Sequence, residues 1–479
     1  MADDTREKHF QSILDQVVKH QDHFTKELKI LRPNNTCKLT IPTLQKLIED
    51  HLRSCYNLHI LITFDDGVKW LLRIRQRTHH RPPTELVLAE LNSEIATLNV
   101  LNKTGLPVPK AYSPLHLDGK MSDDNEVPPL DYFYYEFMKG KPCKVEQANY
   151  YGSIDLPEEE LKQFIEEYAK LQIQISNIKL PYKQIGSIYP SKVKTTHSKG
   201  KKIDDTEIGP FIARGSFMNP SPPYLLGPFT TQKERYLAHI DTTLRYISIE
   251  ALYEEGVENG IDEYLWHLEL RELVSASKRL EKIPQRLYIK HADEKGDHLM
   301  MNDKQDVIGV LDWQWAYVTT KSEAFSTPYI FNRRLFYERG SNGFSKEEGI
   351  LVDSYNRLGR PDLGKCVKAG KIYTRLGDIG HYSKANKKSG YRDVFGKDKP
   401  ADLTPPEDDV DWRVYMMKRH ADNQGLRDYM QKFEWTIEKA EEAARLWHVE
   451  EQEKREQKGM AREEVKTGEH TKVQKSHED

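Results

Sequence analysis

Apolar and polar residues alternate in two short runs, at positions 58–64 and 68–74. This period of two is typical of half-buried β-strands. The sequence Asp65-Asp-Gly67 between the runs favours a tight hairpin turn. In the second run the even-numbered positions share an apolar face, whereas Arg73 lies on the other face. The pattern therefore predicts an antiparallel hairpin on which Arg73 points away from the packed side.

Apolar residues then recur every three or four positions from residue 84 to residue 103. This spacing predicts an amphipathic helix, which Gly105 and Pro107 bring to an end. Glu94 lies at the border of the apolar stripe. A third apolar strand is predicted at 133–138, and a Lys-Gly-Lys-Pro sequence follows it at 139–142. We expect this sequence to mark the end of a small β-rich lobe.

The chain beyond residue 142 has mainly helical periodicity. Pro157 favours a helix start, and Thr231 with Glu234 has the pattern of a capping box. Residues 195–230 are rich in Lys, Gly, Ser and Pro, which predicts a long loop or an insertion at the border of a substrate pocket. Apolar residues almost disappear towards the end of the chain, so residues 449–479 are expected to be a disordered tail or a frayed helix.

Three short apolar strands are predicted at 287–290, 299–301 and 307–311, with polar loops between them. Asp293 lies in the first of these loops, and Asp312 directly follows the third strand. A β-ribbon of this kind places both carboxylates at one site. Phosphoryl transfer from a nucleotide needs one group to orient the acceptor hydroxyl and one carboxylate to hold magnesium. The spacing therefore favours a phosphotransferase.

The composition disfavours several other classes of protein. The 479 residues carry a formal net charge of −3 and the isoelectric point is about 6.7, which disfavours a dedicated nucleic-acid-binding protein. Four scattered cysteines suggest neither a disulfide framework nor a zinc site. The polar N-terminal sequence has no signal or transit pattern, and no window approaches the roughly 20 apolar residues of a membrane span. We therefore expect a cytoplasmic protein without a membrane partner.

Three sequences in the second half of the chain carry a family resemblance. They are Lys-His-Ala-Asp-Glu-Lys-Gly-Asp-His at 290–298, Gly-Val-Leu-Asp-Trp-Gln-Trp-Ala at 309–316 and Glu-Ala-Phe-Ser-Thr-Pro at 323–328. In this order, after the predicted strands and helices, they resemble the aminoglycoside phosphotransferase-like family, and most closely a large fungal branch of it. The resemblance spans about residues 48–382.

The resemblance implies an α+β, bilobal, protein-kinase-like fold with a small β-rich N-lobe and a larger, mainly helical C-lobe. The corresponding domain limits are an N-terminal helical extension at 1–45, the N-lobe at 46–142, the C-lobe at 143–448 and the charged tail at 449–479.

The resemblance also implies roles for individual residues. Asp293 matches the catalytic carboxylate, which orients the substrate hydroxyl towards the γ-phosphate of ATP. Asp312 matches the Mg²⁺ ligand of the family. Arg73 stands where the family usually has a lysine that contacts the nucleotide phosphates, and Glu94 stands where its helix partner lies. An ordinary lobe-stabilising salt bridge is the alternative for this pair. His291 is expected to brace the loop.

Position 298 departs from the family pattern, because His298 stands where the second magnesium ligand is usually asparagine. A neutral imidazole is a poor ligand for Mg²⁺, which prefers oxygen. Two alternatives remain open. Asp297 supplies the oxygen, or His298 ligates a softer ion such as Mn²⁺.

The predicted phosphate loop at 53–57 contains no glycine. Glycines allow backbone amides to approach phosphates closely, and here Ser54 and Asn57 offer side-chain donors instead. By position, the adenine is expected to bond to the backbone near Glu136 to Met138.

Two functional hypotheses follow. The first is an ATP-dependent phosphotransferase that acts on a hydroxyl group of a small molecule. The second is a pseudokinase that binds nucleotide, or a protein partner through the charged tail, without efficient transfer. A protein kinase is a weaker third, because no Ala-Pro-Glu sequence follows Asp312. The substrate pocket is expected to include residues 216–228 and, as a further option, the acidic run at 407–411.

Overall fold

The computed structural model describes residues 2–49, 57–76, 83–117, 127–143, 156–191, 205–212, 222–249, 257–331, 342–377, 379 and 390–475. The chain divides into two compact units. Unit 1 comprises Met1–Ala238 and Lys278–Asp378, and unit 2 comprises His239–Ser277 and Ile379–Asp479. All predicted catalytic, nucleotide-binding and metal-binding residues belong to unit 1. The acidic run at 407–411 belongs to unit 2.

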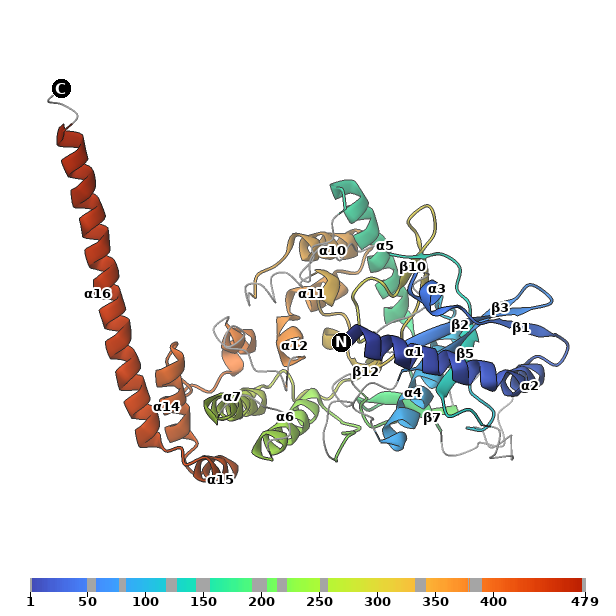
Figure 1. Cartoon of the computed structure of the whole chain (residues 1–479), viewed down its shortest axis with the longest axis horizontal. Helices are drawn as coiled ribbons and strands as arrows, with labels where there is room; N and C mark the ends of the chain where they lie inside the picture. Colours follow the sequence, from blue (N-terminus) through green and yellow to red (C-terminus); the bar gives the residue numbers. More distant parts are fainter. Residues whose placement is uncertain are drawn as a thin grey trace. The chain divides into compact units, whose positions relative to one another are not determined.

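A five-stranded antiparallel sheet forms the N-terminal half of unit 1 (Figure 1). Its strands are β1 (Cys37–Thr40), β2 (Asn57–Phe64), β3 (Lys69–Arg75), β5 (Asp131–Glu136) and β4 (Ala111–Tyr112), in that spatial order. Leu58 of β2 lies opposite Ile74 of β3, so the predicted hairpin is confirmed. Strand β1, which pairs with β2, was not predicted, because four residues with mixed burial carry too short an alternation to identify.

Both faces of this sheet are covered. Helices α1 (Ala2–Lys19) and α2 (Gln21–Leu31) pack on one face, where their apolar residues join Trp70, Leu72 and Ile74 in a single core. Helix α4 (Thr84–Lys103) packs beside β5 and β4 on the other side of the sheet. Its bounds are those predicted from the sequence. Arg73 does lie opposite the first core, as predicted, but it is buried there.

The second half of unit 1 is built from small β-ribbons and helices. Strand β10 (Leu299–Met301) pairs with β11 (Val307–Val310) and β6 (Lys141–Pro142), whereas β9 (Leu287–Lys290) pairs with β12 (Tyr317–Thr320). The predicted β-ribbon is thus confirmed for β10 and β11, whereas β9 belongs to a different sheet. The pairing of β9 with β12 was not predicted.

The helices of this half are short, apart from α5. They are α5 (Glu158–Asn177), α8 (Lys321–Ala324), α10 (Lys346–Arg357), α11 (Pro361–Lys368) and α12 (Lys371–Leu376), whereas α3 (Leu44–Glu49) lies between β1 and β2 in the first half. Strand β7 (Ser187–Pro190) pairs with β8 (Thr206–Gly209). Since β8 lies within 195–230, the described part of that segment is not the plain loop that its composition predicted.

Helix α6 (Gln232–Ser248) crosses the boundary between the two units. Its predicted capping box is present: the backbone N–H of Glu234 donates to Thr231 Oγ1 at 3.1 Å, and that of Thr231 donates to Glu234 Oε2 at 3.3 Å.

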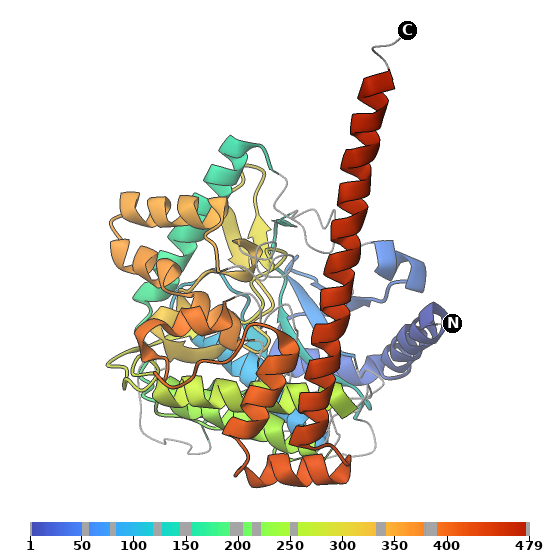
Figure 2. The same cartoon turned by 90° about the vertical axis from the view of Figure 1, so that its left-hand side faces the viewer.

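Unit 2 is helical. Besides the end of α6 it contains α7 (Val257–Ala276), η3 (Tyr391–Asp398), α14 (Asp409–Arg419), α15 (Gln424–Lys432) and α16 (Ile437–Lys475). Helices α14 and α16 lie side by side (Figure 2). The charged tail is helical up to Lys475, so of the two predicted alternatives the structure contains the helix. Within the described residues, no helix combines the length and apolarity of a membrane span.

The α+β class is confirmed, with a small antiparallel sheet at the N-terminal end. The domain limits at residues 45, 142 and 448 remain predictions.

Candidate active site

Lys295 lies in the loop between β9 and β10, beside Asp293. Its Nζ lies 2.7 Å from Asp293 Oδ2. Burial lowers the pKa of Lys295, but the charges of Asp293, Asp297 and Asp312 outweigh this effect and raise it. The two carboxylates that the sequence singled out therefore both act electrostatically on Lys295. Lys295 itself was not identified from the sequence.

His291 holds this loop in place, as predicted. Its Nε2 lies 2.9 Å from the carbonyl oxygen of Leu311, and its Nδ1 accepts a hydrogen bond of 3.2 Å from the backbone N–H of Asp293. Because a carbonyl only accepts, Nε2 carries the proton and one tautomer satisfies both bonds. The imidazole thus ties the segment before Asp312 to the segment that carries Asp293.

Glu294 anchors the same loop to helix α5. Its Oε1 accepts a hydrogen bond of 2.6 Å from the hydroxyl of Tyr168, and its Oε2 lies 3.1 Å from Lys290 Nζ. The side chain is almost completely buried. A buried carboxylate with several donors fixes the backbone on both sides of it, so Glu294 positions Asp293. Sequence reasoning missed this residue, because its partner Tyr168 is 126 positions away.

Asp312 follows β11 with a left-handed backbone, at φ 57°. Aspartate is one of the few residue types that tolerate this conformation. Its Oδ1 accepts a hydrogen bond of 2.8 Å from Arg73 Nη2, while 39% of its side chain remains exposed. Burial raises the pKa of Asp312, but the guanidinium of Arg73 outweighs burial and lowers it. Asp312 is thus an ionised carboxylate with accessible surface, which a cation ligand requires.

Arg73 connects Asp312 to helix α4. The nitrogen Nη2 that bonds Asp312 also lies 3.0 Å from Glu94 Oε1 and 3.1 Å from Gln314 Oε1. The geometry of the predicted Arg73–Glu94 bridge is therefore present. Burial raises the pKa of Glu94 to about 7, because Arg73 only partly offsets burial and the charge of Asp312 adds to it. The charge of Asp312 thus acts on Glu94 as well as on Arg73.

Gln314 lies at the centre of this network, and the sequence did not point to it. Besides Arg73, its Oε1 accepts a hydrogen bond of 3.0 Å from Asn57 Nδ2, and its Nε2 donates to Glu90. Glu90 in turn pairs with Arg75 at 3.1 Å. One amide therefore links β2, β3 and α4 to the segment after Asp312.

A model of the phosphotransferase enzyme family matches residues 55–320, which is more than half of the chain. The chain belongs to this family. The resemblance seen in the sequence is thereby confirmed, and the family assignment is that of a phosphotransferase. The matched region includes both carboxylates, the Arg73 network and the loop of Lys295. No curated protein matches the sequence. The link to a fungal branch remains a prediction.

Several solved structures are similar to this phosphotransferase. Plasmodium vivax ethanolamine kinase has 12% sequence identity and a TM-score of 0.40, with 79% of this chain and 82% of that chain covered. A macrolide 2'-phosphotransferase type I has 13% identity and a TM-score of 0.38, with coverage of 86% and 96%. A thermostable mutant of aminoglycoside phosphotransferase APH(4)-Ia, in complex with AMP-PNP and hygromycin B, has 14% identity and a TM-score of 0.39, with coverage of 85% and 98%.

The imidazole of His298 is not available as a metal ligand in this phosphotransferase. Its side chain is 4% exposed and stacks on His291 with a centroid distance of 4.3 Å. Its Nδ1 accepts a hydrogen bond of 3.2 Å from the backbone N–H of Gly296. Burial, and then the charge of His291, lower the pKa of His298 well below its usual value. A neutral imidazole has one lone pair, and here Gly296 occupies it.

Asp297 is exposed beside Lys295. Partial desolvation raises its pKa, Lys295 opposes this, and the charges of Asp293 and Asp312 add to it. Of the two open alternatives, the structure therefore favours an oxygen from Asp297 over a nitrogen from His298. Magnesium is commonly held by one or two carboxylates plus substrate phosphates. Asp312 and Asp297 together fit that requirement.

The expected nucleotide-binding residues have three different outcomes. Ser54 lies outside the described residues. The amide nitrogen of Asn57 is bonded to Gln314 in the buried network, so a phosphate contact by Asn57 requires that bond to break. The backbone N–H groups of Glu136 and Phe137 already donate to Lys110 and Lys69. The predicted adenine contact with the backbone near Glu136 to Met138 remains a prediction.

Proposed function

We propose that this phosphotransferase transfers the γ-phosphoryl group of ATP to a hydroxyl group of a small molecule. The observation that supports the proposal is that His291 bonds both to Leu311, next to Asp312, and to the backbone of Asp293, so that the two carboxylates belong to adjoining segments. The acceptor oxygen attacks the γ-phosphorus, the bond to ADP breaks, and the hydroxyl proton passes towards Asp293. Negative charge builds up on the phosphoryl oxygens during this step, and nearby cations stabilise it.

In this proposal each described residue has a defined task. Asp293 orients the acceptor hydroxyl, and Lys295 neutralises part of the charge beside it. Asp312 and Asp297 would hold Mg²⁺ or Mn²⁺, which would supply positive charge for the phosphates. Arg73, held by Glu94, would contact the phosphates. Met138 bonds the adenine through its backbone. A cytoplasmic location belongs to the proposal, since the reaction consumes ATP.

The test is ATP consumption by purified protein with Mg²⁺ and a panel of hydroxylated metabolites. Asp293→Asn should reduce the substrate-dependent rate by about 10²- to 10⁴-fold, because it removes the general base and keeps the side-chain volume. Asp303→Asn is the matched control, since Asp303 is an almost fully exposed carboxylate in the turn of the same β-ribbon. Equal rates in the two variants would refute the role of Asp293.

The geometry of His298 and Arg73 favours one alternative, a pseudokinase that binds nucleotide without efficient transfer. The second metal position lacks an available imidazole lone pair, and Asp312 is paired with Arg73 rather than open on all sides. In this alternative the charged tail binds a protein partner. Thermal stabilisation by ATP with Mg²⁺ or Mn²⁺, combined with no turnover across the metabolite panel, would favour it over the kinase.

A further inference from the structure

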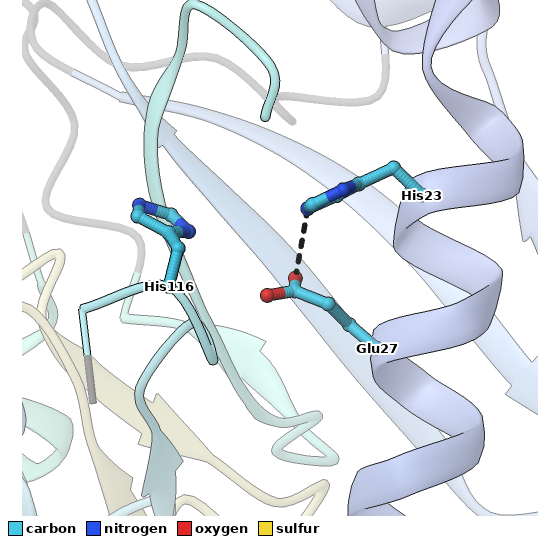
Figure 3. A group of neighbouring side chains, drawn as sticks. All are labelled: His23, Glu27 and His116. Atoms are coloured by element: carbon cyan, nitrogen blue, oxygen red, sulfur yellow. Dashed lines mark ion pairs between the residues drawn. The ribbon is translucent and has the colours of Figure 1, made fainter. Parts of the chain in front are cut away.

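Three ligand-type side chains meet on the other face of the five-stranded sheet, away from Arg73. His23 and Glu27 lie four positions apart on α2, so they share one face of the helix. His116 comes from the segment after β4. One ligand atom from each residue lies within 4.8 Å of the other two, and His23 Nε2 is 3.8 Å from Glu27 Oε2. Figure 3 shows the three side chains converging from two segments that are distant in sequence.

The position on the sheet separates this cluster from the proposed catalytic residues. Tyr132, which contacts both His23 and Glu27, belongs to the core beneath α1 and α2. Its neighbour Phe133 points to the opposite face and lies across from Arg73 in the ladder. Since side chains alternate between faces along a strand, the cluster and Arg73 lie on opposite sides of the sheet.

The carboxylate of Glu27 is buried and oriented by hydrogen bonds, as a metal ligand requires. Its side chain is completely buried. Its Oε1 accepts a hydrogen bond of 2.8 Å from the backbone N–H of Leu115, and its Oε2 accepts bonds of 2.8 and 2.6 Å from the hydroxyls of Tyr132 and Tyr134. These three donors orient the carboxylate. A carboxylate has about four lone-pair positions, so one remains for a further partner.

His116 has an unused acceptor or donor position. Among the described residues, its buried Nδ1 has no hydrogen-bond partner. A neutral imidazole nitrogen without a hydrogen has the lone pair that binds a metal. A buried polar atom without a partner is unfavourable, and a bound ion removes that cost.

We propose that His23, Glu27 and His116 bind one Zn²⁺ ion, with water in the fourth position. Two imidazoles and one carboxylate are a ligand set that zinc uses, whereas Mg²⁺ and Ca²⁺ prefer oxygen alone. Zinc–ligand bonds of about 2.0–2.1 Å in a tetrahedron place ligand atoms about 3.3 Å apart. Both tyrosine hydroxyls bond to Oε2 of Glu27, so Oε1 is the oxygen with a remaining lone pair, and zinc binding replaces the contact of His23 Nε2 with the Tyr132 hydroxyl.

The ion has a structural task in this arrangement. His23 and Glu27 belong to α2, while His116 and Tyr132 belong to the sheet and the segment that leads to it. Zinc therefore links the N-terminal helices to the sheet. This structural role is separate from the proposed phosphoryl transfer. Metal binding to residues that the unfolded chain does not hold together adds directly to folding stability.

The test uses full-length protein that has been stripped of metal with a chelator. Zinc should bind at one equivalent and raise the melting temperature by on the order of 5 °C at 100-fold excess over its dissociation constant. The same concentration of Mg²⁺ should produce no shift. Failure of the metal-free wild-type protein to take up one equivalent of zinc would overturn the proposal, without any reference to a variant or to ATP.

A pair of variants locates the bound ion. His116→Gln should lose zinc uptake at one equivalent and the thermal shift with it. His20→Gln is the matched control, because His20 precedes α2, makes no capping bond there and is not part of the cluster. With Co²⁺ in place of zinc, His20→Gln should show the visible absorption of a tetrahedral site and His116→Gln should not. Zinc uptake that is unchanged in His116→Gln would contradict the assignment, whatever the outcome of the phosphotransferase assay.

Discussion

Two buried glutamates in unit 1 are each paired with a buried arginine, yet they behave in opposite ways. Glu323 accepts two hydrogen bonds from Arg235 Nη1, at 2.8 and 2.9 Å. Four further donors surround it; they belong to Gln232, Tyr236, Tyr317 and Thr319. Its pKa is lowered to about 2, because Arg235 and these donors outweigh the effect of burial.

Glu94 has the same kind of partner and a different environment. Arg73 lies 3.0 Å away but is shared with Asp312 and Gln314. Burial and the neighbouring carboxylates raise the pKa of Glu94 to about 7. The comparison shows that one arginine does not determine the charge state of a buried carboxylate. Glu323 accepts hydrogen bonds from several donors of its own and therefore stays ionised. Glu94 shares its arginine with Asp312, so it can change its charge beside the proposed active site.

Removing the charge of Glu323 should cause the largest loss of stability. Glu323→Gln leaves Arg235 buried without a counter-ion, which costs about 3–5 kcal/mol of unfolding free energy. Denaturant-induced unfolding of unit 1 measures this loss. Glu281→Gln is the control, since Glu281 is 65% exposed and pairs with Lys233 on the surface; its effect should stay within about 0.5 kcal/mol. A loss below 1 kcal/mol for Glu323→Gln would contradict the account of this site.

Acid should remove the contribution of Glu323 in a defined pH window. Its pKa falls from 4.5 to about 2 on folding, so the folded state binds fewer protons than the unfolded state in this window. Its contribution, on the order of 3 kcal/mol, is complete above pH 4.5 and is lost as the pH falls towards 2. The stability difference between wild type and Glu323→Gln should therefore shrink between pH 5 and pH 3. A constant difference would show that the charge is not what stabilises the site.

Glu94 should show the opposite sign and a smaller effect. Its pKa rises from 4.5 to about 7 on folding, so the folded state binds more protons between these values. Stability contributed by this group therefore decreases, by about 1–3 kcal/mol, as the pH rises from 4.5 to 7. Glu94→Gln should remove that decrease, because glutamine resembles the protonated acid; the variant should match wild type near pH 4.5 and be about 1–3 kcal/mol more stable than wild type at pH 7 and above. An unchanged pH profile in the variant would rule out titration of Glu94.

The sequence predicted those features that depend on local pattern. The β2–β3 hairpin, the limits of α4 and the two aspartates at the ends of β-ribbon strands all follow from neighbouring residues. The position of Glu94 beside Arg73 followed from family resemblance together with helix spacing. These elements are the ones in which a short segment determines its own structure.

The missed features depend on contacts between distant segments. Gln314 joins Asn57, Arg73 and Glu90 across more than 200 positions, and no local pattern distinguishes it from a surface glutamine. Glu323 was read as part of a packing motif, but its donors on α6 lie about 90 positions earlier. His298 was predicted at the metal because of its place in the motif. Its burial against His291 is a tertiary property that the motif does not contain.

A crystal structure with AMP-PNP and Mn²⁺ tests the central claim most directly, because anomalous scattering locates the manganese ion. We predict manganese at about 2.0–2.2 Å from a carboxylate oxygen of Asp312, with the terminal phosphate between this ion and Lys295, and with Asp293 facing the phosphorus. A manganese ion bound away from Asp312, or a terminal phosphate out of reach of Asp293, would contradict the proposed phosphotransferase mechanism.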